Sequence, residues 1–334
     1  MTTPATSFEH LLILSDEVGT CEQADYAQPR RSRGYRTADI ARVLIATTRQ
    51  TRPPQAVVDL GHTAQRFLSD AQQADGHVHG GRLFTGAWEG QHDEDAWGLS
   101  MWAWGTVVRL GADARIRRQA TSCFRRGAAH RAGSARAMAF AGLGAIEVLT
   151  ARPHYDDARD LACDAISRIG PLSDDPAWPW PEDRLVDVNA VLCEFLVAAG
   201  SLLQRPEVLA DGVRLLAWLL ARQTVDGHLS PTPSGGSGPD DIPAGFPQRP
   251  IEVAAMAAAC ARALAITGEP HWHAGVQMAA QWFAGRNDVN AVMWDPDTDG
   301  GYDALNAAGP DLNQGAESTL ALLITLQHAR SPAA

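Results

Sequence analysis

The sequence predicts an all-α protein, an (α/α)6 barrel of twelve helices, and three observations lead to this prediction. Apolar residues recur with a helical period through twelve segments, and Pro or Gly residues stand in most of the breaks. Strand signals are confined to two short stretches, at 289–294 and 301–303. The sequence Q-Q-A-D-G-H-V at 72–78 recurs as Q-T-V-D-G-H-L at 223–229. Each copy follows an odd-numbered helix, as duplicated helical hairpins would produce.

The predicted helices form six consecutive pairs. Their ranges are 7–17, 38–50, 55–74, 95–111, 113–130, 133–150, 155–169, 183–203, 206–222, 251–268, 271–285 and 314–329. Because each pair adds core without starting a new domain, we expect one domain over residues 1–334. The loops at 75–94, 223–250 and 286–313 are long, and long loops in a compact domain are more often functional than accidental. We expect them at one mouth of the barrel.

The composition argues against several classes of function. The net charge of -11 argues against a nucleic-acid partner, which needs a basic surface. The chain has no lysine, which excludes Schiff-base chemistry, attachment of pyridoxal phosphate and a P-loop. Its five cysteines include no C-x-x-C pair, so they predict neither a disulfide framework nor a zinc ribbon. No apolar run approaches the ~20 residues of a membrane span. We expect a cytoplasmic protein with no membrane partner, and its oligomeric state stays open.

Polar side chains gather at the starts of the even-numbered predicted helices. If these helices form the inner ring, the polar groups converge at the mouth of the barrel. The residues are Asp39 and Arg42, Asp93 to Asp95, Arg131, Ser134 and Arg136, Glu182 and Asp183, Gln248, Arg249 and Glu252, and Asn313, Gln314 and Glu317. One acidic residue in a first turn is ordinary capping. Five of the six starts, however, combine a carboxylate with an amide, Arg or Trp, and this combination indicates a site for a polar ligand.

Tryptophan is abundant near these starts, and a sugar is the ligand that suits it. An indole face packs on the C–H face of a sugar ring, while carboxylates and amides bind its hydroxyls. The tryptophans beside carboxylates are Trp88, Trp97, Trp178, Trp180 and Trp294, whereas Trp102, Trp104, Trp218 and Trp282 are expected in the core. His77, His79 and His92 share one loop, but their spacing fits no familiar zinc site. We expect them to be solvated or to donate to a substrate, with no metal and no cofactor.

Several motifs resemble those of a bacterial (α/α)-barrel family whose members are often labelled "glycosyltransferase". Residues 180–194, W-P-E-D-R-L-V-D-V-N-A-V-L-C-E, resemble its motif W-x-E-D-x-L-x-Y-D-N-A-x-L-x-E. Further signatures are Q-R-P-I-E at 248–252, G-R-N-D at 285–288, D-P-D-T-D-G-G-Y-D-A-L at 295–305 and N-Q-G-A-E-S-T at 313–319. The resemblance implies an (α/α)6 fold similar to many glycosidases, with genes commonly near mannoside-processing enzymes.

The chain departs from this family at two inner-helix starts. The family reads D-D-N-A-R where this chain has residues 38–42, A-D-I-A-R, and Y-D-N-A where it has residues 187–190, D-V-N-A. Ile40 and Val188 therefore stand where the family has polar groups. Such losses are compatible with an altered substrate or with lost activity.

We expect a glycoside hydrolase acting on an oligosaccharide, with a mannose-containing one as a candidate. Hydrolysis needs one carboxyl group as acid and another as base or nucleophile, and their separation decides between inversion and retention. The candidates are Asp95, Asp183, Glu252 and Glu317. The residues expected to bind substrate are Asp39, Arg42, Trp88, Trp180, Asn189, Gln248, Arg286, Asn287, Asp288, Tyr302, Asp303, Asn313 and Gln314. The alternatives are a sugar epimerase or isomerase, which would need histidines at inner-helix starts, and a non-catalytic sugar-binding relative.

Overall fold

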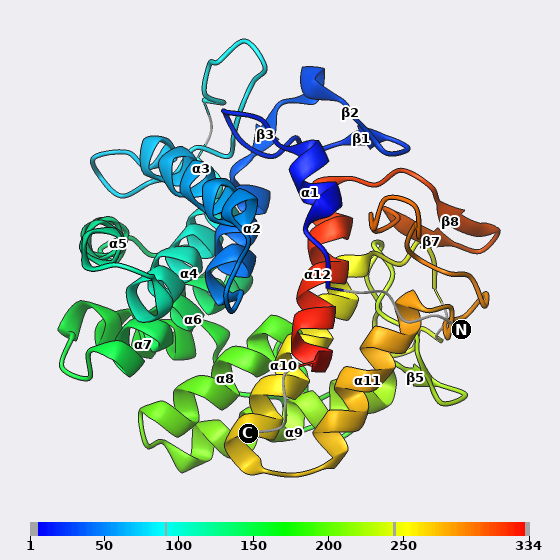
Figure 1. The fold of residues 1–334 in the computed structure, drawn as a ribbon. Coiled ribbons are helices and arrows are strands. Elements are labelled where there is room, and N and C mark those ends of the chain that lie inside the picture. Colours follow the sequence, from blue (N-terminus) through cyan, green and yellow to red (C-terminus); the bar gives the residue numbers. More distant parts are fainter. Residues whose placement is uncertain (1–5, 91, 243–244, 331–334) are drawn as a thin grey trace. The chain divides into compact units, whose positions relative to one another are not determined.

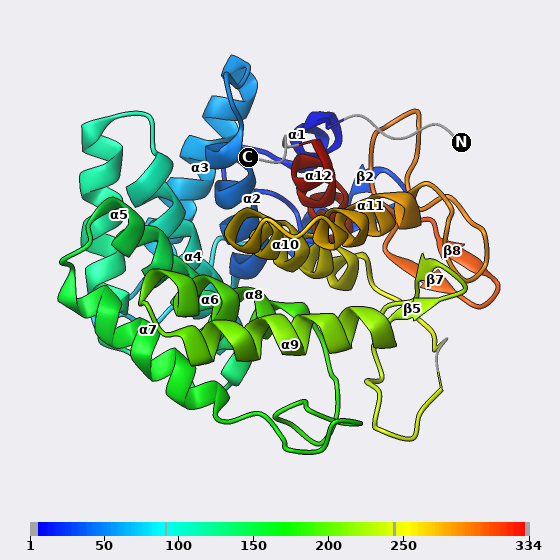
Figure 2. The same cartoon turned by 90° about the horizontal axis from the view of Figure 1, so that it is seen from below.

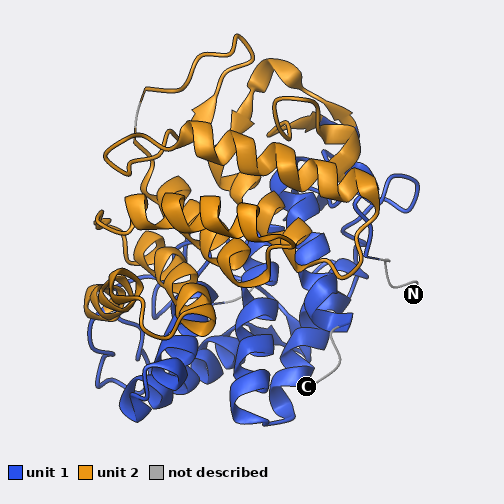
Figure 3. Ribbon diagram, turned by 60° about the vertical axis from the view of Figure 1, so that its left-hand side comes forward, with its two compact units in different colours: residues 1–10, 25–27, 170–334 blue, residues 11–24, 28–169 orange. Residues whose placement is uncertain are grey.

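The structure is a computed structural model that describes residues 6–90, 92–242 and 245–330. Its contacts separate two compact units, shown in different colours in Figure 3. Unit 1 comprises residues 1–10, 25–27 and 170–334, and unit 2 comprises residues 11–24 and 28–169. Each unit is described separately.

The elements follow the predicted helical order. Unit 2 contains β2 (Gln28–Pro29), the 3₁₀ helix η1 (Arg31–Arg33), β3 (Tyr35–Arg36), α2 (Thr37–Arg49), α3 (Gln55–Ala71), β4 (Gly81–Arg82), α4 (Glu94–Leu110), α5 (Ala114–Gly127), α6 (Ala135–Ala151) and α7 (Asp156–Ile169). Unit 1 contains α8 (Ala190–Leu202), α9 (Pro206–Arg222), β5 (Thr224–Val225), β6 (His228–Leu229), α10 (Pro250–Thr267), α11 (His271–Phe283), β7 (Ala304–Asn306), β8 (Gly309–Asp311) and α12 (Ala316–Arg330). The helix α1 (Glu9–Leu14) and the strand β1 (Ala24–Asp25) have residues in both units.

Within each unit the even-numbered helices form the inner layer, as predicted. In unit 2, α4 packs against α2 and α6, and each of these three is backed by the helix that follows it (Figure 1). In unit 1, α10 packs against α8 and α12 and is backed by α11, while α9 backs α8 (Figure 2). The sequence accounts for the two layers. Every residue from Pro250 to Cys260 of α10 is buried, whereas α7 buries only one face, through Ala158, Leu161 and Ala165 among others.

The repeated Asp-Gly-His segments have similar local structures. Asp226 and Gly227 both have positive φ, 48° and 77°, and connect β5 to β6 as a two-residue hairpin turn. In the first copy Gly76 has a φ of 92°, and the turn is closed by antiparallel pairing of Gln72 with Val78. Both turns follow outer helices, α3 and α9, which agrees with the predicted duplication.

Two predicted elements differ from the structure. The eighth helix was expected from residue 183, but α8 begins at Ala190, and residues 183–189 are irregular. Leu185 and Val188 are apolar and three residues apart, a spacing that is typical of a helix. Both are buried, but they belong to a loop. No strand occupies 289–294 in the described chain; instead Trp294 makes a single bridge to Gly301, and the hairpin of β7 and β8 comes later.

Helix α10 is long and apolar enough to meet the usual length and composition criteria for a membrane span. Of the window that meets them, 61% is buried inside the protein. The same window carries Glu252 and Arg262, and α10 contacts α8, α11 and α12. These features are those of a core helix.

The inner helices of unit 2 approach so closely that glycine is required at the contact. A Cβ atom at Gly105 of α4 would lie 2.2 Å from the carbonyl oxygen of Gly144 of α6. A Cβ atom at Gly144 would in turn lie 2.2 Å from the carbonyl oxygen of Met101. Backbone oxygen atoms of a packed helix cannot move away, so no residue with a Cβ atom fits at either position without moving the helices.

Candidate active site

Three inner-helix starts of unit 1 contribute carboxylates around one guanidinium group. Arg249, which precedes α10, forms an ion pair with Glu317 in the first turn of α12. The negative charges of Asp187, three residues before α8, and of Glu252, in the first turn of α10, also stabilise the positive charge of Arg249. Helix starts favour acidic residues because their unpaired N–H groups and the helix dipole attract negative charge. Glu252 and Glu317 follow that preference, whereas Asp187 lies in the irregular segment just before α8.

The electrostatic balance at Arg249 is favourable. Burial by itself favours the neutral form of the guanidinium, but Glu317, Asp187 and Glu252 outweigh it and raise the pKa of Arg249. The side chains of Arg249 and Glu317 are 39% and 30% exposed, so the pair is accessible to a ligand.

Glu252 lies deeper and fixes the segment before α8. It is 5% exposed, and its carboxylate accepts hydrogen bonds from the backbone N–H of Val188 and, at 3.4 Å, from the amide of Asn189. Val188 has a φ of 46°, in the left-handed region that β-branched residues avoid. Such a conformation costs about 1–3 kcal/mol and persists where neighbouring groups enforce it. Asn189 is fully buried and also bonds the backbone of Val186 at both of its amide atoms.

Asp303 holds the start of α12. One carboxylate oxygen accepts hydrogen bonds from the N–H of Gly315 at 2.7 Å and the hydroxyl of Ser318 at 2.6 Å. Burial raises the pKa of Asp303; these two hydrogen bonds oppose the shift, and the negative charges of Asp311 and Glu317 add to it. The site therefore contains a carboxyl group that holds a proton more readily than a solvent-exposed aspartic acid does.

The raised pKa of Asp303 predicts a pH-dependent stability difference. The folded pKa exceeds the ordinary value of 3.8, so the folded state binds more protons than the unfolded state between the two pKa values, and stability falls as pH rises through that interval. Asp303→Asn keeps an oxygen acceptor but removes the charge. Its melting temperature relative to wild type should therefore rise as the pH increases from about 4 through the folded-state pKa of Asp303, as measured by circular dichroism. A difference that stays constant with pH would contradict this prediction.

Several residues of the C-terminal motifs build turns. Asn287 is 2% exposed and bonds the carbonyls of Trp282 and Ala291 and the N–H of Ala291. Gln314 is also 2% exposed, accepts from the hydroxyl of Thr298 and donates to Asp295. With every side-chain polar group engaged, these two amides act as scaffold in the structure.

Other predicted binding residues of unit 1 divide between scaffold and surface. Asn313 accepts a bond from the N–H of Tyr26, Tyr302 is half-buried, and Arg286 is exposed and bonds Gln281. Gln248 is fully buried and donates to Asp288 at 2.5 Å, and Asp288 also bonds the ring of His228 at 2.9 Å. These contacts join the segment before α10, which contains Gln248, to the segment after α11, which contains Asp288.

Asp183 and Trp180 lie in the irregular segment before α8. Asp183 is exposed, and because α8 starts seven residues later it is not part of a helix N-terminus. Trp180 is 1% exposed, stacks on Trp218 at 6.1 Å and donates to Glu182 at 3.1 Å. Its ring is covered by protein, so stacking on a sugar would require it to move.

In unit 2 an acidic pocket lies at the start of α4. Asp95 is exposed in its wall, which is also lined by Arg36, Gly80, Glu89, His92, Asp93, Glu94 and Ser134. Asp93 caps α4 by accepting from the N–H of Ala96, and Glu94 accepts from the N–H groups of Gly133 and Ser134. Asp93 thus has the expected capping role of an acidic residue, whereas Glu94 connects α4 to the backbone just before α6.

The remaining predicted residues of unit 2 are Asp39, Arg42 and Trp88. Asp39 and Arg42 form a buried ion pair at 3.1 Å in the first turns of α2. Trp88 is half-buried, stacks on His79 and lies under the guanidinium of Arg82. No described contact tests whether any of the three binds a substrate, so these roles stay predictions.

Sequence reasoning did not assign Asp187 or Arg249 to the site. In the sequence Asp187 is the residue before Val188, where the chain departs from the family motif, and Arg249 is one of several polar residues at a predicted helix start. The family motif could have pointed to Asp187. In the alignment with that motif, Asp187 comes one position before the place where the family has its aspartate.

Comparisons with known proteins establish the fold. No family model and no curated protein matches the chain. Among solved structures, a sugar epimerase from a ruminal bacterium matches with a TM-score of 0.75 at 11% identity, over 97% of this chain and 95% of that chain. Cellobiose 2-epimerase from Spirochaeta thermophila matches with a TM-score of 0.70 at 12% identity, over 96% and 92%. An α-mannanase from Bacteroides thetaiotaomicron matches with a TM-score of 0.62 at 10% identity, over 89% and 86%.

The fold is that of the (α/α)6 barrels. At identities this low the likeness concerns the fold alone, and the named neighbours differ in their chemistry. The resemblance to the family labelled "glycosyltransferase" stays a prediction.

Proposed function

We propose that the protein is a carbohydrate-active enzyme that hydrolyses a glycosidic bond of an oligosaccharide. The observation that carries the proposal is the group of carboxyl groups around Arg249, contributed by the starts of α8, α10 and α12. Glycosidic hydrolysis needs two carboxyl groups in different protonation states. The neighbours named as sugar-processing enzymes support a carbohydrate substrate.

Glu317 and Asp303 are the proposed reacting pair, because the surroundings of Glu317 favour a charged carboxylate and those of Asp303 favour a protonated carboxyl group. Glu317 is ion-paired with Arg249, as a carboxylate acting as base or nucleophile would be. Asp303, whose pKa is raised by burial and by the charges of Asp311 and Glu317, would supply the proton to the leaving oxygen. Asp187 replaces Asp183 in the proposed site, because the charge of Asp187 acts on Arg249, and its proposed role is to bind substrate.

Glu252 is proposed as a positioning residue. Its carboxylate is occupied by Val188 and Asn189, so it holds the segment that carries Asp187. Asp187 and Arg249 would then bind sugar hydroxyls through charge-assisted hydrogen bonds.

Hydrolysis is favoured over epimerisation by the residue types present. Epimerisation or isomerisation needs a base and an acid of pKa near neutrality, typically histidines, at the reacting carbon. In the described ranges, the first turns of α2, α4, α6, α8, α10 and α12 contain no histidine.

The test is a product screen of the purified protein. Mannose-, glucose- and arabinose-containing oligosaccharides are incubated with and without phosphate, and products are resolved by mass spectrometry and anion-exchange chromatography. A shorter sugar is expected without phosphate. Interconversion without shortening would instead establish an epimerase or isomerase, and sugar-dependent thermal stabilisation without turnover would establish a binding protein.

A further inference from the structure

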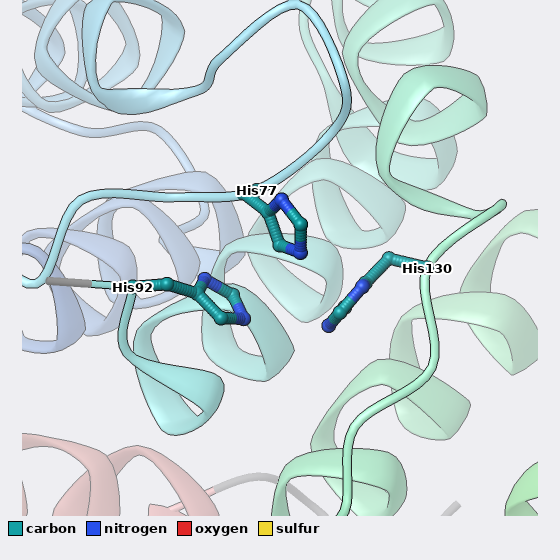
Figure 4. Close-up of side chains that lie close together, drawn as sticks. All are labelled: His77, His92 and His130. Atoms are coloured by element: carbon teal, nitrogen blue, oxygen red, sulfur yellow. The ribbon is translucent and has the colours of Figure 1, made fainter.

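Three histidine rings of unit 2 lie close together. His77 belongs to the loop between α3 and α4, His92 lies two residues before α4, and His130 lies three residues after α5. Their ring centroids are 4.2 Å apart for His77 and His92, 4.4 Å for His77 and His130, and 5.0 Å for His92 and His130. Figure 4 shows the three rings turned toward one another.

We propose that these histidines bind a divalent transition-metal ion, with zinc as the expected metal. One nitrogen from each ring lies within 4.8 Å of the other two. Tetrahedral zinc with Zn–N bonds of about 2.0–2.1 Å requires nitrogens about 3.3 Å apart, so small side-chain rotations would close the site. Imidazole is a favoured ligand of zinc, nickel, cobalt and copper, whereas magnesium and calcium prefer oxygen.

The surroundings of His77 fit a metal ligand. Its Nδ1 lies 3.0 Å from a carboxylate oxygen of Asp75, whose other oxygen accepts the N–H of residue 77 at 3.1 Å. A carboxylate on one ring nitrogen fixes the tautomer and turns the other nitrogen toward the metal. Asp75 would therefore orient His77 through its Nδ1 while Nε2 binds the ion.

His130 contributes a buried ring nitrogen to the group. Within the described chain its Nε2 has no hydrogen-bond partner. Burying an unpaired polar atom is costly, and a bound ion would satisfy it. The ring also packs edge-on against Trp97 at 4.9 Å, which restricts its orientation.

Glu94 adds negative charge without occupying the site. Its two oxygens accept the N–H groups of Gly133 and Ser134, each at 2.8 Å, and its charge acts on His92 and His130. Three imidazoles and a nearby carboxylate would leave the fourth tetrahedral position for water.

His79 is not part of the proposed site, although it shares the loop. Its two ring nitrogens contact Gln73 at 3.3 Å and the carbonyl of Glu89 at 3.0 Å, and the ring stacks on Trp88. The third ligand is instead His130, which lies far away in sequence. The ion would thus join the loop before α4 to the segment after α5, at the edge of the acidic pocket that His92 also lines.

Metal titration of untagged, chelator-stripped protein tests the proposal. Zinc should bind at one ion per chain by isothermal titration calorimetry, and cobalt(II) should give the strong visible absorption of tetrahedral nitrogen coordination. His77→Ala and His130→Ala should each lose more affinity than Asp75→Asn, which should lose about 10–100-fold. His154→Ala, at an exposed histidine of the same unit, is the matched control and should bind like wild type.

Stability supplies a second readout. Zinc should raise the melting temperature of wild type and of His154→Ala, because a ligand that binds only the folded state stabilises it. His130→Asn, a smaller change than alanine in a partly buried site, should fold but gain nothing from zinc. Failure of wild type to bind zinc or cobalt, or unchanged affinity in both His77→Ala and His130→Ala, would overturn the proposal.

Discussion

Glu317→Gln is expected to lower kcat on the oligosaccharide found by the product screen by about 10²–10⁴-fold, the usual contribution of a general acid or base. Glutamine has the size of glutamate and can still contact Arg249, but it cannot take up a proton. Substrate binding should therefore persist, as seen in an unchanged thermal shift with the sugar. Initial rates at saturating substrate provide the measurement.

The matched control is Glu207→Gln, which changes an exposed glutamate in the first turn of the outer helix α9. It should keep wild-type turnover. Asp303→Asn should lose turnover like Glu317→Gln and yet gain relative stability at neutral pH, a combination that loss of structure cannot produce. Wild-type kcat in Glu317→Gln would refute the assigned pair.

The two-layer arrangement was predictable from the sequence because burial leaves a distinct pattern in each layer. Inner helices such as α8 and α10 are mostly apolar and are buried around most of their circumference, whereas in outer helices such as α7 buried apolar residues recur with the helical period on one face. Helix boundaries followed from Pro and Gly in the breaks. The start of α8 was an exception, because residues 183–189 contain no Pro or Gly, and contacts distant in sequence keep them irregular: Leu185 pairs with the backbone of Ser237, and Val188 has a positive φ.

The site was less predictable because the same residue types serve as ligands and as scaffold. Asn287 and Gln314 belong to specific motifs, but their hydrogen bonds hold loops. Which polar residue remains exposed depends on contacts between segments distant in sequence. The ion pair of Arg249 with Glu317, 68 positions apart, and the approach of His130 to His77 are contacts of this kind.

The departure at residues 187–190 has a physical interpretation. The family's carboxylate position is occupied by Val188, but Asp187, one residue earlier, acts on Arg249. The N–H of Val188 bonds Glu252, and this holds the backbone in its unusual conformation. We propose that the carboxylate has moved by one residue rather than been lost, a proposal that rests on the resemblance to that family.

Gly144→Ala is expected to destabilise the protein by about 1–3 kcal/mol or more, although alanine is the better helix former by roughly 1 kcal/mol. The new methyl group would lie 2.2 Å from the carbonyl oxygen of Met101, and the helices α4 and α6 would have to separate. The urea midpoint should fall, with Gly235→Ala, where no atom lies within 4 Å of the added carbon, staying near wild type. An unchanged or higher midpoint for Gly144→Ala would mean that α4 and α6 can move apart without cost. Gly105 contacts the same point of α6, so Gly105→Ala combined with Gly144→Ala should cost less than the sum of the two, since either methyl group alone already separates the helices.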